Sequence, residues 1–135
     1  MDTQRVLADI SATGDLLERA LKLSGLVTSM FAEAGFRLVV VGGAAVEFYT
    51  EGGYMSGDID FCRRGAARIP LRLAQDIMAR LGAVGGPRSW QVCGLFVDML
   101  GALENESKAP LRSVGTPYGT VTLIPRELAL VERVL

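Results

Sequence analysis

The stretch that decides the fold runs from residue 36 to residue 62 and reads FRLVVVGGAAVEFYTEGGYMSGDIDFC. Residues 36–41 form a β-branched apolar run bounded by glycines, which predicts a buried strand. Gly42 and Gly43 end this strand, and residues 44–49 suit a short helix that opens on the glycine pair. Residues 51–57 hold three glycines and a serine, so they predict a turn-rich connection. The alternation of polar and apolar residues at 58–62 then predicts a second strand.

Further elements are predicted on both sides of this stretch. Apolar residues recur at helical spacing over 13–34, with Thr13 or Gly14 as the cap and Gly35 as the C′ residue. Residues 3–10 predict one or two helical turns, and residues 68–81 predict another amphipathic helix. Strands are expected at 89–93, 95–100 and 120–124, the first two joined tightly at Gly94, before a helix over 126–135 that begins after Pro125. This order predicts an α/β or α+β fold, with a mixed β-sheet flanked by helices.

Length and composition restrict the possible functions. The 135 residues suit a single domain, and the absence of a cap after the last predicted helix is consistent with a piece of a longer chain. There is no histidine, which excludes histidine-based catalysis and most zinc sites. Cys62 and Cys93 lack CxxC spacing and are typical of a reduced, cytoplasmic protein. The longest apolar run, residues 38–46, is too short to cross a bilayer, so no membrane partner is expected.

Two features of the deciding stretch indicate phosphate and metal chemistry. Gly42 and Gly43 let the backbone approach a phosphate closely at a helix N-terminus, although such a pair is more often plain turn geometry. Strand alternation places Asp58 and Asp60 on one face, where two carboxylates repel each other unless a cation or a proton intervenes. Mg²⁺ suits such oxygen ligands. For an isolated pair of this kind, a solvated strand face or a turn is the simpler interpretation.

A third aspartate lies in the apolar run Phe96-Val97-Asp98-Met99-Leu100. An unpaired carboxylate there would cost several kcal/mol, roughly, so Asp98 needs a partner. One interpretation is a salt bridge to an arginine such as Arg88, and the other is a metal site shared with a neighbouring strand.

The combination of Gly42-Gly43, Asp58-x-Asp60 and a strand-borne Asp98 resembles the DNA polymerase β-like nucleotidyltransferase superfamily. It is most similar to the small bacterial branch of minimal and abortive-infection toxin–antitoxin nucleotidyltransferases, and the resemblance covers roughly residues 36–100. The resemblance implies the nucleotidyltransferase fold. It further implies that Gly42, Gly43 and Ser56 bind the triphosphate, and that Asp58, Asp60 and Asp98 hold two Mg²⁺ ions. One departure is Tyr54, where many relatives carry a basic residue.

Three hypotheses follow. The first is a Mg²⁺-dependent enzyme that transfers NMP from an NTP, with ATP the first candidate, to a tRNA end, a partner protein or a small molecule, in a toxin–antitoxin setting. The second is a non-catalytic nucleotidyltransferase-like module of the antitoxin type that binds a partner protein. The third is an α/β domain with structural aspartates.

Two other groups of residues bear on the site. The arginines near the predicted helix over 68–81 either form a solvated helix start or flank the cleft and receive a phosphate-bearing acceptor: Arg63, Arg64, Arg68 and Arg72. Trp90 is expected in the core, with base stacking as the alternative.

Overall fold

Seven strands form one mixed sheet in the computed structural model, which describes residues 2–49, 57–103 and 111–125. The strand order is β3-β4-β5-β2-β1-β7-β6. The strands are β1 (Leu38–Val41), β2 (Asp58–Arg63), β3 (Val84–Gly85), β4 (Ser89–Val92), β5 (Leu95–Ala102), β6 (Arg112–Thr116) and β7 (Gly119–Leu123). The described helices are α1 (Thr3–Ala12), α2 (Leu16–Glu33), α3 (Gly42–Tyr49) and α4 (Leu71–Arg80). The predicted mixed sheet with flanking helices is therefore confirmed.

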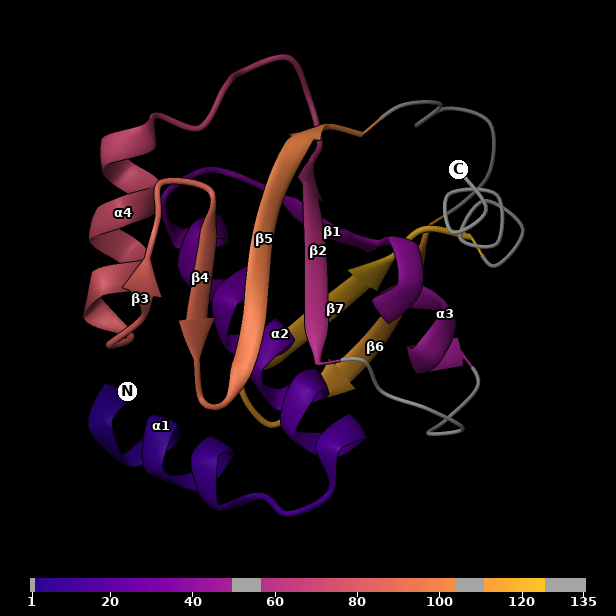
Figure 1. Cartoon of the computed structure of the whole chain (residues 1–135). Helices are drawn as coiled ribbons and strands as arrows, with labels where there is room; N and C mark the ends of the chain where they lie inside the picture. The colour runs from indigo at the N-terminus through magenta and orange to yellow at the C-terminus, as the bar shows by residue number, and fades with distance from the viewer. Residues whose placement is uncertain (1, 50–56, 104–110, 126–135) are drawn as a thin grey trace.

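The centre of the sheet is built from β5, β2 and β1. Strand β2 pairs in parallel with β5 and antiparallel with β1, and β1 in turn pairs in parallel with β7. Ile59 and Phe61 of β2 are buried, as their alternation predicts. In Figure 1, α2 lies behind β5 and β2, and no described helix lies in front of these two strands. One face of β5 and β2 is thus covered by α2, and no described helix covers the other face of these two strands, which we call the open face.

The boundaries of several helices differ from the prediction. The second helix begins at Leu16, because Asp15 is its N-cap and accepts a hydrogen bond from the Glu18 N–H at 2.9 Å. The predicted C′ role of Gly35 is confirmed, since its φ is +93°. Helix α4 begins at Leu71 rather than at residue 68, because Pro70 disfavours helical geometry in the residue before it.

Two of the observed strands were not predicted from the sequence. Strand β3 has two residues within a segment rich in glycine and proline, and β6 has the exposed, mostly polar sequence RSVGT. Neither carries the run of apolar side chains that marks a buried strand. The predicted final helix over 126–135 lies outside the described residues. The tight connection at Gly94 is confirmed, because Cys93 and Gly94 both have positive φ between the paired residues Val92 and Leu95.

The core lies between the covered face of the sheet and the helices that pack against it. Trp90 is buried, as predicted, and its Nε1–H donates to Gln75 Oε1 of α4 at 3.2 Å. Toward the opposite edge of the sheet, α2 packs against β7, where Gly25 of the helix lies close to Gly119 at the start of the strand. Among the described residues, none of the helices has the length and apolar character needed to cross a bilayer.

Candidate active site

The three predicted aspartates lie on the same, open face of the sheet. The parallel register pairs Asp60 with Asp98 and Asp58 with Phe96, and strand alternation turns all three carboxylates to the same side. In its protonated form, the Asp60 carboxyl group donates a hydrogen bond to the Asp98 side chain. Because β2 and β5 are neighbours in space but not in sequence, this contact depends on the sheet order.

The electrostatics of Asp60 are those of a crowded acidic site. Partial burial raises the pKa of Asp60 to about 6, assisted by the hydrogen bond to Asp98 and by the charges of Asp98, Asp58 and Glu47. A carboxyl group with this pKa binds a proton easily, and a cation that occupied the site would relieve the same repulsion. The arrangement therefore favours positive charge at this point of the sheet.

The glycine pair lies directly beside Asp60. Val41 is opposite Asp60 in the antiparallel β1–β2 register, so the next residue, Gly42, begins α3 against the carboxylate. A Cβ atom built on Gly42 would lie 3.1 Å from Asp60 Oδ2, and the φ of Gly42 is +65°. The positive φ favours glycine here, and a Cβ atom would in addition require the Asp60 carboxylate to shift slightly.

Two further polar residues belong to the site and were missed in the sequence. Ser89 of β4 lies opposite Asp98, and its hydroxyl is hydrogen-bonded to Asp98 Oδ1. Glu47 of α3 is 4% exposed and adds its charge to the surroundings of Asp60. Glu47 could have been identified from the sequence, because it is the single charged residue in the helical stretch GGAAVEFY. Ser89 could be found only from the register of β4 on β5.

The alternative of an Arg88–Asp98 salt bridge is not supported, because Asp98 forms no ion pair within the described part of the chain. Arg88 instead contributes its backbone carbonyl, which accepts a hydrogen bond from the Met99 N–H at 2.7 Å. Ser56 and Tyr54 lie outside the described residues. Of the predicted site residues, Gly42, Asp58, Asp60 and Asp98 are thus brought together, and Gly43 follows Gly42 at the start of α3.

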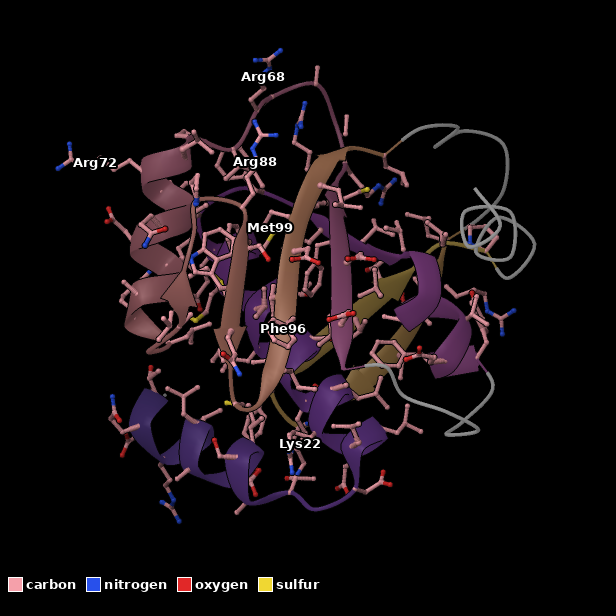
Figure 2. The ribbon with its side chains drawn as sticks, in the orientation of Figure 1. Lys22, Arg68, Arg72, Arg88, Phe96 and Met99 are labelled. Carbon is pink, nitrogen blue, oxygen red and sulfur yellow. The ribbon has the colours of Figure 1, made fainter. Side chains whose placement is uncertain are left out.

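Apolar side chains flank the carboxylates on the open face. Phe96 and Leu100 point to the same side of β5 as Asp98 by alternation, and they are 47% and 52% exposed. Figure 2 shows Phe96 on the face of β5 that is turned toward the viewer. An exposed ring beside a cluster of carboxylates offers a surface on which a planar base could stack.

The donor set fits Mg²⁺, which in nucleotide-binding sites is usually held by one or two carboxylates together with substrate phosphates. Asp60 and Asp98 supply two adjacent carboxylates, and Asp58 adds a third negative charge. In the described part of the chain, no three or more acidic, cysteine or histidine side chains form a ready-made metal cluster. The phosphates of a nucleotide would have to complete the coordination.

Comparisons with protein-family models, with curated proteins and with solved structures found no match. The class of protein is therefore defined by the fold and the site alone: a mixed α/β sheet protein with a carboxylate cluster on its open face and a glycine pair beside it.

Proposed function

We propose that this chain is a Mg²⁺-dependent nucleotidyltransferase that transfers NMP from an NTP to a hydroxyl acceptor. One observation carries the proposal: the parallel pairing of β2 with β5 brings Asp60 against Asp98, and a Cβ atom built on Gly42 would lie 3.1 Å from Oδ2 of the same Asp60. Acidic residues for metal, a glycine pair at a helix start for phosphate and an open sheet face for substrate are the parts that the reaction needs.

The aspartates and Ser89 have distinct roles in the proposed reaction. Asp58, Asp60 and Asp98 would hold Mg²⁺, which when bound lowers the pKa of the acceptor hydroxyl and offsets the charge of the leaving pyrophosphate. The acceptor oxygen attacks the α-phosphorus, the bond from that phosphorus to the bridging oxygen breaks, and pyrophosphate leaves with the electron pair. The Asp98 carboxylate receives the hydroxyl proton, and the hydrogen bond from Ser89 fixes its orientation.

The test is calorimetric titration of ATP and then of the other NTPs, with and without Mg²⁺, followed by transfer of label from α-labelled NTP. Asp60→Asn and Asp98→Asn are expected to abolish Mg²⁺-dependent binding and transfer. Asp76→Asn is the matched control, because Asp76 is exposed on α4 and the substitution removes the same charge far from the cluster. Equal NTP affinity in wild type and Asp60→Asn would refute the proposal.

A non-catalytic partner-binding module is the second candidate, and the exposure of Phe96 and Leu100 on the open face favours it. The same titration separates the two functions. If no NTP binds with any divalent metal, the open face is to be tested as a surface for protein contact.

A further inference from the structure

A second concave site lies at one end of the central strands, where its lining includes side chains from both faces of β5: Met99 opposite the carboxylates and Leu100 on their side. It is a pocket of about 480 Å³, formed where β2 and β5 end and α4 begins. Phe61 and Met99 line it, and each directly follows one of the paired aspartates along its strand. Strand alternation therefore turns these two side chains away from the acidic face. A molecule held against Phe61 and Met99 would therefore lie on the other side of the sheet from the carboxylates.

The charged groups of the pocket are all cationic. Arg63, Arg68 and Arg88 line it, and none of its described lining residues is acidic. Figure 2 shows Arg68 and Arg88 at the same end of the sheet, above Met99, whereas Arg72 points outward from α4. The predicted basic group is thus divided: Arg63 and Arg68 line the pocket, whereas Arg64 and Arg72 do not.

Two further observations favour an anionic ligand at this pocket. The Nε atom of Arg63 is buried and has no hydrogen-bond partner among the described residues. Helix α4 also begins at the pocket with Pro70 as its N-cap, without a capping side chain and without an acidic residue in its first turn. The N-terminal N–H groups and the positive end of the helix dipole are therefore available to a negative group.

The remainder of the wall is apolar and includes Leu38, Ile69 and Leu71 in addition to Phe61 and Met99. Arginine forks match the oxygens of a phosphate group, and the apolar wall suits a carbon body of moderate size. The volume falls within the range of small-molecule sites, roughly 300–1,000 Å³. We propose that this pocket binds a small organic phosphate monoester, with its phosphate at the three arginines and its apolar body against Phe61 and Met99.

Phenyl phosphate is a suitable probe, because it joins a doubly charged phosphate to an apolar ring. Calorimetric titration is expected to give saturable one-site binding to the wild-type chain. Arg68→Ala and Arg88→Ala, both at exposed positions, are each expected to weaken the affinity about tenfold, as the loss of one charge-assisted contact does. Arg72→Ala is the matched control, because Arg72 is an exposed arginine of α4 outside the pocket lining, and it should leave the affinity unchanged. Melting curves of the variants establish that they are folded.

Two further arms complete the test. Asp60→Asn is expected to keep phenyl phosphate binding, so that failure of the carboxylate site and failure of this pocket are distinguishable. Inorganic phosphate is expected to bind more weakly than phenyl phosphate, since it lacks the apolar body. The proposal is overturned by equal affinity for the two probes, by unchanged affinity in Arg68→Ala and Arg88→Ala, or by the absence of saturable binding up to about 10 mM.

Discussion

The carboxyl group of Asp60 has an environment that favours its protonated form. Its pKa is raised from 3.8 to about 6, first by burial and then by the neighbouring carboxylates. Between these two pH values the folded state binds more protons than the unfolded state, so the free energy of unfolding falls as the pH rises through about 6. Without metal, the protein is therefore expected to be more stable at pH 5 than at pH 7.5 as far as Asp60 is concerned.

The variant Asp60→Asn isolates this contribution. Because the carboxyl group is only partly buried, we expect the variant to be about 1 kcal/mol more stable than wild type at pH 7.5, or roughly 3 °C in melting temperature. At pH 4.5 the difference should largely disappear. Melting temperatures of both proteins across this pH range, in the presence of a chelator, test the expectation. An identical pH dependence in the two proteins would show that Asp60 is not the responsible group.

Gly42 is the second residue whose chemistry is closely constrained. Gly42→Ala puts a Cβ atom 3.1 Å from Asp60 Oδ2 at a φ of +65°. We expect a loss of about 1–2 kcal/mol in the free energy of unfolding from the backbone conformation, together with weaker NTP binding. Chemical denaturation and calorimetry measure the two effects. Gly115→Ala, on an exposed strand position with open space around it, serves as the control and should change neither.

The site could be predicted only in part at this scale. The alternation of β2 is a local property, so the common face of Asp58 and Asp60 was available from the sequence. The apolar surroundings of Asp98 correctly indicated that it needs a partner. Its actual neighbours, Asp60 and Ser89, follow from strand pairing, which is decided by contacts between distant segments of the chain.

At the scale of elements, α2 approaches the β6–β7 hairpin closely at Gly25. A Cβ atom on Gly25 would lie 2.1 Å from Thr116 Oγ1 and 2.9 Å from the Gly119 carbonyl oxygen. The helix is fixed there by Ser29 Oγ, which donates to the Tyr118 carbonyl at 2.9 Å. Neither backbone can withdraw without the loss of buried contacts.

Gly25→Ala is therefore expected to cost about 1–3 kcal/mol of unfolding free energy through overpacking. The result is unusual for a helix interior, where the same change ordinarily stabilises by up to ~1 kcal/mol. Gly14→Ala, with nothing within 4 Å of the added atom, is the control and should be close to neutral. Denaturant titration of the two variants measures both values. A stabilised Gly25→Ala would mean that α2 can move away from the hairpin.

The elements themselves were largely predictable, because buried strands and amphipathic helices leave strong local patterns. The errors are at the edges. Strands β3 and β6 occupy the two ends of the sheet order, and an edge strand has only one neighbour and little need of apolar side chains. The start of α2 was placed too early because Thr13 is also a good cap residue, although Asp15 performs the role.

The whole molecule is organised by the central strands, whose two faces carry opposite kinds of chemistry. The net charge of −1 gives no sign of this, because carboxylates and guanidinium groups cancel in the sum. Their positions do not cancel, since Asp58, Asp60 and Asp98 are on one face and the three pocket arginines are at the end of the other.

The sheet separates the negative charges of the open face from the positive charges near the start of α4. These six residues therefore contribute a dipole moment across the sheet although the net charge is close to zero. An approaching charged molecule is turned toward one face before any contact is made, and this steering weakens as salt shortens the reach of the field. The overall charge therefore says little about which side of this protein a partner meets first.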